Sequence, residues 1–397
     1  MRVLFLTHRL PYAPNRGDRA RAFHMAHTLA RHVDLHLVSL AHDTRELQEV
    51  GRLREAGINA RAFRARPLSR YITGALRLAG TRPLTHILLD APGLRKHVAE
   101  LCRTKPPDVV LAYCSGMARF AMEEPLVRYP LVLDMVDVDS AKWALLAQTA
   151  RWPISWVYRR EARYLGRFEA EATARAITTL VVNAREQTTL EGLAPGTDVR
   201  VMQLGVDLDH LRPATPPTES PRVVFCGVMN YTPNVEGVLW FAREVWPRVR
   251  AARPDAMFTI VGSSPAKAIS HLATESSGIE VTGTVPDVRD YLWSAGVSVA
   301  PLLTARGTQN KVLEALAAQL PCVVSESVAA GLPQEALAGC RLGTSAETFS
   351  REIVALLDMT GAERRAVAAR ATLQTLGWEE QLAPLLPILE SAAAQAR

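Results

Sequence analysis

Short apolar runs alternate with helix-forming stretches along this 397-residue chain, and this alternation constrains its fold more than any other feature. The first half has six runs typical of buried strands, at residues 3–7, 33–40, 108–112, 131–135, 179–182 and 199–202. Helices are predicted over 19–31 and, as one long helix with an exposed face, over 154–176. Strands that alternate with helices predict an α/β domain whose parallel sheet is covered on both faces.

The alternation starts again after residues 212–221, which hold four prolines and little apolar content and are therefore predicted to be a linker. Further strands are predicted at 222–226, 258–261, 280–282, 297–301 and 322–325, with helices over 235–251, 288–295 and 309–320. Because the chain also exceeds the usual size of a single core, we expect two doubly wound domains. Such domains facing across a cleft bind ligands at the carboxyl ends of their strands.

Cysteine usage and hydropathy indicate the compartment. The five cysteines form no C-x-x-C pair, so neither a zinc site nor a redox motif is indicated. The first apolar run is too short for a secretory signal, and no run approaches the roughly 18 residues of a membrane span. We therefore expect a cytoplasmic protein with reduced thiols.

Positive charge is concentrated in the first half of the chain. Residues 1–205 hold 30 basic and 20 acidic side chains, a balance of +10, whereas the remainder holds 16 and 20, a balance of −4. This asymmetry favours an anionic partner for the first half: an acidic lipid surface, a lipid-phosphate acceptor or nucleic acid. The alternative is codon bias, because the basic residues are 41 Arg and only 5 Lys.

Residues 306–320 carry the strongest functional signal. A helix that begins there, directly after a strand, points its free N–H groups and positive dipole end at whatever lies beyond the strand, which favours a phosphate. Asn310, Lys311 and Glu314 share one face near that end. The amide and the ammonium group suit phosphate oxygens, with Lys311 as the dominant contact, and the carboxylate suits sugar hydroxyls. The alternative is a surface helix with a Lys–Glu pair.

Two loops that follow the first strand of each half are also candidates for ligand contacts. In the loop at 11–19, Gly17 permits close approach of the backbone and Asp18 suits a helix N-cap. This loop either borders the sugar and diphosphate or is an ordinary strand–helix turn. In the second half, Gly227 permits the same approach and Asn230 can donate to a donor phosphate. The sequence contains no G-x-G-x-x-G fingerprint, so an NAD-type site has no support.

A cluster of carboxylates, Asp134, Asp137 and Asp139, stands at the end of another predicted strand. Such carboxylates can position acceptor hydroxyls, serve as a base or bind a metal, although no histidine joins them. The alternative is helix capping by Asp139 or Ser140 with solvation of the others. The histidines are scattered, and the sequence suggests no Ser/His/Asp or Cys/His arrangement.

Six segments carry a family resemblance: NRGDRAR at 15–21, VDVDS at 136–140, GVD at 205–207, VTGTVPDV at 281–288, RGTQNKVLE at 306–314 and GWE at 377–379. With these segments the chain resembles the GT-B glycosyltransferases of glycosyltransferase family 4. Within that family it is similar to sugar transferases associated with PEP-CTERM/exosortase exopolysaccharide systems. The resemblance implies a Rossmann-like acceptor-side domain over 1–205 and a Rossmann-like nucleotide-sugar domain over 206–375. Residues 376–397 would return to the first domain as a helix.

The resemblance further implies a metal-independent, retaining transfer of a sugar from a nucleotide-sugar donor to a hydroxyl acceptor, with no cofactor besides the donor. Fixed positive groups would stabilise the leaving diphosphate. Glu314 matches the second acid of the family's E-x7-E element and would bind the nucleotide ribose. Arg306 stands where the first acid is expected and suits a phosphate or the acceptor. Leu204 likewise replaces the Asn expected before Gly205.

The principal hypothesis is a cytoplasmic, hexosyltransferase-like enzyme of exopolysaccharide or cell-surface glycan biosynthesis that works at the inner membrane face. Asp137 and Arg306 are the expected catalytic residues. Arg19, Arg21 and the basic first half would meet a lipid-linked or glycan acceptor or an acidic membrane surface, and no nucleic-acid partner is expected. The alternatives are a sugar-nucleotide epimerase on the same fold and a non-catalytic nucleotide-sugar-binding subunit, since a fold does not fix a function.

Overall fold

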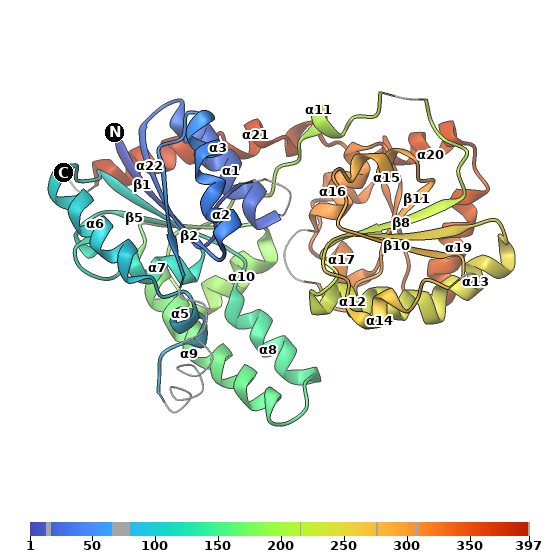
Figure 1. The fold of residues 1–397 in the computed structure, drawn as a ribbon, viewed down its shortest axis with the longest axis horizontal. Coiled ribbons are helices and arrows are strands. Elements are labelled where there is room, and N and C mark those ends of the chain that lie inside the picture. Colours follow the sequence, from blue (N-terminus) through green and yellow to red (C-terminus); the bar gives the residue numbers. More distant parts are fainter. Residues whose placement is uncertain (13–16, 66–79, 215, 275–276, 306–308, 396–397) are drawn as a thin grey trace. The chain divides into compact units, whose positions relative to one another are not determined.

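The computed structural model describes residues 1–12, 17–65, 80–214, 216–274, 277–305 and 309–395. The chain forms two compact units (Figure 1). Unit 1 comprises Met1–Gln203 and Gln381–Arg397, and unit 2 comprises Leu204–Glu380. The proline-rich segment 212–221 therefore lies within unit 2.

A seven-stranded parallel sheet forms the centre of unit 1, in the order β3-β2-β1-β4-β5-β6-β7. The predicted apolar runs form its central strands, and residues 3–6 and 109–112 are completely buried. Strands this apolar require cover on both faces, in agreement with the predicted layers. The strands are β1 (Arg2–Thr7), β2 (Asp34–Ala41), β3 (Ala60–Arg64), β4 (Val109–Tyr113), β5 (Leu131–Val136), β6 (Thr178–Val181) and β7 (Val199–Val201).

Helices pack against this sheet. The last helix, α22 (Leu385–Ala394), contacts β4 and β5, so the C-terminal segment covers the middle of this sheet. Helices α8 (Asp139–Thr149) and α9 (Ile154–Arg175) pack against each other as a hairpin, and α9 contacts β5 of the sheet (Figure 1). The remaining helical segments are α1 (Gly17–Ala30), α2 (Thr44–Gln48), α3 (Val50–Glu55), α5 (Leu84–Leu88), α6 (Pro92–Thr104), α7 (Ser115–Ala121), η1 (Leu126–Arg128) and α10 (Ala184–Leu193).

Unit 2 repeats this strand order in a six-stranded parallel sheet, β10-β9-β8-β11-β12-β13. Its strands are β8 (Arg222–Cys226), β9 (Met257–Val261), β10 (Ile279–Gly283), β11 (Val297–Ala300), β12 (Cys322–Val324) and β13 (Cys340–Leu342). In both sheets the order reverses beside the first strand, between β1 and β4 and between β8 and β11. This is the doubly wound arrangement, and ligands bind such sheets at the carboxyl ends of the two strands where the order reverses.

The helices of unit 2 include the three predicted over 235–251, 288–295 and 309–320, with shifted bounds, and several that were not predicted. They are α11 (Leu208–Leu211), α12 (Thr232–Trp240), α13 (Trp246–Ala252), α14 (Lys267–Ser270), α15 (Arg289–Trp293), α16 (Asn310–Ala317), α17 (Glu326–Ala329), α18 (Gln334–Leu337), α19 (Ala346–Leu357), α20 (Gly361–Ala368) and η3 (Gln374–Leu376). Helix α21 (Trp378–Leu382) spans the division between the units.

Besides the short helices that were not predicted, two strands and one helix differ from the sequence prediction. Strands β3 and β13 were not predicted, because β3 interrupts its apolar residues with arginines and β13 has only three residues, all partly exposed. Both are edge strands, where burial constrains the sequence least. The helix predicted over 235–251 begins earlier, at Thr232, and contains the π-helical segment η2 (Phe241–Val245) directly before the Pro247 turn of α13.

Two segments that carry the family resemblance contact each other within unit 2. Val206 N–H donates to Leu376 O over 2.9 Å, and Val206 pairs with Gly377. A Cβ on Gly205 would lie 2.5 Å from the Trp378 ring, so only glycine fits there. Asp207 caps α11 by accepting from His210 N–H. The GVD and GWE motifs are thus parts of one packing arrangement.

Candidate nucleotide-sugar site

The candidate site lies at the strand-order reversal of unit 2. Helix α12 follows β8 and helix α16 follows β11, and these two strands are neighbours in the sheet. Both loops therefore leave the sheet at the same edge. Helix α12 packs closely against the loop after β11. Gly237 of α12 allows this contact, since a Cβ there would lie 2.8 Å from Pro301 O. The predicted residues Gly227, Asn310, Lys311 and Glu314 come from these two connections.

Lys311 is held in place by neutral groups. Its Nζ donates to Asn234 Oδ1 over 2.9 Å and lies 3.5 Å from Gln309 Oε1. The ammonium group also stands 5.0 Å from the centre of the Phe225 ring, in cation–π geometry. The side chain is half-buried, and burial lowers its pKa to about 8. A positive charge that is desolvated, positioned and, among the described residues, hydrogen-bonded to amides suits a phosphate ligand.

Asn310 and Glu314 complete the start of α16. The Asn310 Oδ1 atom is buried and has no hydrogen-bond partner among the described residues. Glu314 lies one turn further along the helix and is half-buried, and burial raises its pKa while Lys311 opposes that shift. The side chain of the N-cap residue Gln309 accepts no hydrogen bond from the backbone N–H groups of the first turn. A buried polar atom without a partner requires an explanation, and a bound ligand supplies one.

Gly227 shapes the opposite side of this arrangement. A Cβ at this position would lie 2.8 Å from Asn234 Nδ2, the same amide whose oxygen accepts from Lys311. Asn234 Nδ2 also donates to Val228 O over 2.9 Å, so one buried amide ties the loop to the lysine. Glycine is therefore required for the position of Asn234, in addition to the close ligand approach predicted from the sequence.

The sequence interpretation named Asn230 and missed Asn234. Asn230 is exposed in the β8–α12 loop, and Asn234 is the residue that contacts Lys311. A signal for Asn234 was present, because it shares one buried stripe of the helix with Val238 and Phe241. An amide at the end of an otherwise apolar stripe needs a polar partner.

The first three residues of the predicted segment 306–320 lie outside the described residues. Arg306, expected to be catalytic, falls in the segment 306–308, so its expected role stays a prediction. Cys226, the last residue of β8, lies beside the site, and burial, with a smaller contribution from Glu314, raises the pKa of its thiol to about 12. A thiol that remains protonated is a poor nucleophile, which leaves no chemical role for Cys226.

In unit 1, the loop residues predicted to bind substrate lie at the start of α1. Helix α1 begins at Gly17, so Asp18 lies in the first turn and is not the N-cap that the sequence analysis expected. Arg19 pairs with the buried carboxylate of Glu46, which also accepts from His42 N–H over 2.7 Å. Arg9 Nη1 lies 3.7 Å from the same carboxylate, so Arg9 and Arg19 share the charge of Glu46.

The expectation that Arg21 faces an acceptor or a membrane is wrong. Arg21 and Asp134 are both completely buried, with Arg21 Nε 2.8 Å and Nη2 3.3 Å from the two carboxylate oxygens. Arg21 Nη1 also donates to Gln203 O over 3.0 Å. The bidentate pair joins α1 to the end of β5. It stabilises unit 1 and cannot contact solvent or lipid, because a charged group this deeply buried needs its partner.

The remaining carboxylates at the end of β5 are more accessible. Asp137 is half-buried, with Oδ2 3.7 Å from Lys142 Nζ, and Asp139 lies 3.1 Å from the same ammonium group. Neither Asp139 nor Ser140 caps α8, whose N-cap is Val138. Ser140 instead donates to the buried Glu169, whose pKa burial raises to about 8. Asp137 stays a candidate for the acceptor side.

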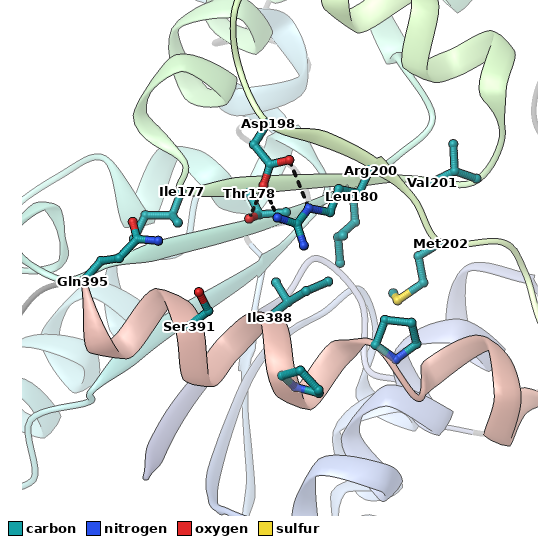
Figure 2. Close-up of a pocket in the computed structure, with 12 residues that line it drawn as sticks. Ile177, Thr178, Leu180, Asp198, Arg200, Val201, Met202, Ile388, Ser391 and Gln395 are labelled. Carbon is teal, nitrogen blue, oxygen red and sulfur yellow. Dashed lines mark hydrogen bonds and ion pairs between the residues drawn. The ribbon is translucent and has the colours of Figure 1, made fainter.

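A separate pocket of about 490 Å³ lies in unit 1, between β6, β7 and α22 (Figure 2). Its charged groups are already paired: Arg200 Nη2 lies 2.9 Å from Asp198 Oδ2, and Thr178 Oγ1 donates to the same oxygen over 2.8 Å. None of the predicted site residues is among its lining residues. We therefore assign it no ligand.

Comparisons with known proteins agree with this geometry. Residues 220–359 match a family model described as "Glycosyl transferases group 1", and this range contains the site of unit 2 from Gly227 to Glu314. No curated protein sequence matches the chain. Among the described residues, no helix has both the length and the apolar character that crossing a bilayer requires.

Solved structures match over the full length. Sucrose-phosphate synthase from Thermosynechococcus elongatus superimposes with a TM-score of 0.72 at 14% identity, covering 100% of both chains. Anabaena Alr3699/HepE in complex with UDP and glucose gives 0.71 at 13% identity, covering 98% of this chain and 100% of that one. An α,α-trehalose 6-phosphate synthase from Burkholderia multivorans gives 0.66 at 12% identity, covering 100% of both. The predicted fold class, two parallel-sheet α/β domains of the GT-B type, is confirmed.

Proposed function

We propose that this protein is a glycosyltransferase that moves a sugar from a nucleotide-sugar donor to a hydroxyl acceptor. The observation that carries the proposal is the start of α16, where Lys311 is fixed by Asn234 and the buried Asn310 Oδ1 has no partner within the described part of the chain. Both lie where a doubly wound sheet binds its ligand. The family match over unit 2, and the UDP and UDP-glucose bound by the HepE neighbours, support the same conclusion.

In this proposal the donor diphosphate contacts Lys311 and the free N–H groups of α16. A helix N-terminus contributes about 0.3–1 kcal/mol, whereas an ammonium about 4 Å from a phosphate charge gains about 4 kcal/mol of gross attraction before desolvation. Lys311 therefore dominates. As the glycosidic bond breaks, negative charge grows on the leaving diphosphate, and a fixed cation stabilises that transition state more than the ground state.

Glu314 accepts from the ribose hydroxyls in this proposal, one helical turn beyond the phosphate contacts. Gly227 lets the backbone of the β8–α12 loop approach the donor. Asn310 can donate its amide N–H to a phosphate oxygen or accept from a sugar hydroxyl, and either contact orders its side chain against the ligand. The family resemblance adds retention of configuration and independence of a metal ion, which remain proposals of the same kind.

The acceptor is proposed to meet unit 1, which holds the positive charge of the chain. Asp137 would position the acceptor hydroxyl or take its proton, and Arg306 would contact phosphate or acceptor. A lipid-linked or glycan acceptor of exopolysaccharide synthesis, at the inner membrane face, fits an anionic partner for this half. Since Arg21 is buried and Arg19 is paired, other basic residues of unit 1 must supply that contact.

The test has two arms. Thermal shift against UDP, GDP, ADP and their glucose conjugates should identify at least one stabilising nucleotide, because a ligand that binds only the folded state raises its stability. The donor identified in this way is then incubated with and without a lipid-phosphate acceptor. A transferase releases nucleoside diphosphate in step with acceptor glycosylation. An epimerase changes the donor without acceptor, and a binding subunit changes nothing. Absence of any nucleotide binding would reject the proposal.

A further inference from the structure

The turn between α8 and α9 exposes an unusual group of side chains. Trp152 is 80% exposed, Ile154 53% and Trp156 48%, so three of the large exposed apolar residues of the described chain fall within five positions. We refer to residues 151–159 as the hairpin tip. Isolated exposed apolar residues are common, but a contiguous group of this size indicates an interaction surface.

The hairpin tip is also positively charged. Residues 141–160 contain four basic and no acidic side chains, and Arg151 and Arg159 are exposed on either side of the tryptophans. Further along α9, Arg163 and Arg167 are exposed at four-residue spacing, so they continue the face that carries Arg159. Tryptophan beside arginine is the combination found where proteins enter the interface of an acidic bilayer.

Packing and hydrogen bonds hold the rest of the hairpin in place and so position the tip. The rings of Trp143 on α8 and Tyr158 on α9 pack with centroids 5.2 Å apart. Nearer the sheet, Glu161 of α9 is buried and accepts from the N–H groups of Leu84 and Thr85 over 2.7 and 2.9 Å. Figure 1 shows the turn between α8 and α9 directed away from the sheet of unit 1.

We propose that the hairpin tip docks on an anionic lipid bilayer, with Trp152, Ile154 and Trp156 in the interfacial layer and Arg151 and Arg159 against the headgroups. The inference rests on the proposed function only in that an acceptor at the membrane gives the docking a purpose. The occupant is a lipid surface because the tip combines exposed apolar side chains with exposed arginines that no acidic residue of 141–160 compensates. Since the apolar and charged contributions act together, loss of either weakens binding.

The test is flotation of the full-length protein with vesicles of phosphatidylglycerol and phosphatidylcholine in equal parts, and with phosphatidylcholine alone. The wild-type protein should float with the acidic vesicles only, and high salt should release it. Trp152→Ser with Trp156→Ser, and separately Arg151→Gln with Arg159→Gln, should each reduce the bound fraction by about tenfold or more. The matched controls are Leu193→Ser with Leu342→Ser and Arg243→Gln with Arg248→Gln, which change similarly exposed positions elsewhere.

Each outcome decides the proposal. Tip variants that float like the wild-type protein, or a wild-type protein that does not float, overturn it. Sedimentation equilibrium addresses a second copy of this chain as the occupant: a wild-type dimer that the tryptophan variant converts to monomer, without vesicle binding, also overturns it. Melting temperatures should match the wild-type value, since all the changed side chains are exposed. Nucleotide binding is measured in parallel, so failure of the proposed function and failure of docking are distinguishable.

Discussion

The two units share one strand order but treat the polar side chains at the strand-order reversal differently. In unit 1 the cations there lie against carboxylates: Arg21 pairs with Asp134, and Arg9 and Arg19 share Glu46. In unit 2, among the described residues, the cation Lys311 donates hydrogen bonds to two neutral amides, and the carboxylate on its helix, Glu314, forms no ion pair with it. The same topology thus contains a set of charges that are compensated internally and one charge that is available to an anionic ligand.

This difference shows why fold alone does not locate a function. Both sheets have loops at the carboxyl ends of the strands where the order reverses. In each unit the sequence places a glycine and basic residues in these loops. What separates them is the partner of each cation, which the sequence does not state directly. A buried, paired guanidinium contributes structure, whereas a positioned ammonium with neutral partners retains charge for a ligand.

The largest effect is expected when the buried ion pair of unit 1 loses its cation. Arg21→Leu leaves Asp134 buried without its cation, which should lower the free energy of unfolding by about 3–5 kcal/mol. Because the pair is structural, affinity for a nucleoside diphosphate should not change in the folded fraction. Urea unfolding and nucleotide titration measure the two quantities. The double variant Arg21→Met with Asp134→Leu should recover most of the stability. A stable Arg21→Leu protein with weakened nucleotide binding would show that the assignment is wrong.

The second largest effect is expected from Lys311→Ala, which removes the cation of the unit 2 site. Charge-assisted hydrogen bonds contribute about 1.5–3 kcal/mol, so affinity for the nucleoside diphosphate found by thermal shift should fall about 100-fold. The melting temperature without ligand should change little, because removal of a half-buried cation is favourable whereas the buried Asn234 Oδ1 loses its donor. Calorimetric titration measures the affinity, with Lys105→Ala, an exposed lysine of unit 1, as the matched control. Equal losses in both variants would point to a general charge effect.

The pH dependence of binding sharpens the comparison further. Burial lowers the pKa of Lys311 to about 8, and only the ammonium form attracts phosphate. The charge is therefore present below this pKa and is lost as pH rises through it, so nucleotide affinity should fall about tenfold between pH 7 and pH 9. In Lys311→Arg the guanidinium stays charged, and the profile should be flat over this range. An equally steep fall in both proteins would assign the titration to another group.

A smaller effect is expected at Asn310. Its buried Oδ1 has no partner among the described residues, so Asn310→Ala removes a group that unliganded protein leaves unsatisfied. Stability should be unchanged or slightly higher, and nucleotide affinity should fall about fivefold, in keeping with one hydrogen bond of about 1 kcal/mol. The matched control is Asn230→Ala at the exposed position in the other loop. A larger loss for Asn230→Ala would show that Asn230, rather than Asn310, makes the stronger contact with the nucleotide.

The sequence predicted the buried framework well because apolar runs report burial directly. The central strands β1, β4, β5, β8, β9 and β11 and the long helix α9 were all found from periodicity. Edge strands β3 and β13 were missed because partial exposure lets polar residues enter them.

At the candidate site, spacing brought Asn310, Lys311 and Glu314 together because all three lie on one helix. Asn234 lies 77 positions before Lys311 and meets it only through sheet topology, which single-helix spacing cannot show. The pairing of Arg21 with Asp134 was missed for the same reason, because the two residues are 113 positions apart.

The central claim is that the nucleoside diphosphate binds unit 2 at the start of α16. Hydrogen exchange tests it most directly, comparing the full chain with and without the nucleotide that stabilises it most. Slower exchange should appear at the amides of residues 227–231 and 309–314, and should be absent in Lys311→Ala at the same nucleotide concentration. Protection confined to unit 1, or equal protection in the Lys311→Ala protein, would contradict the claim.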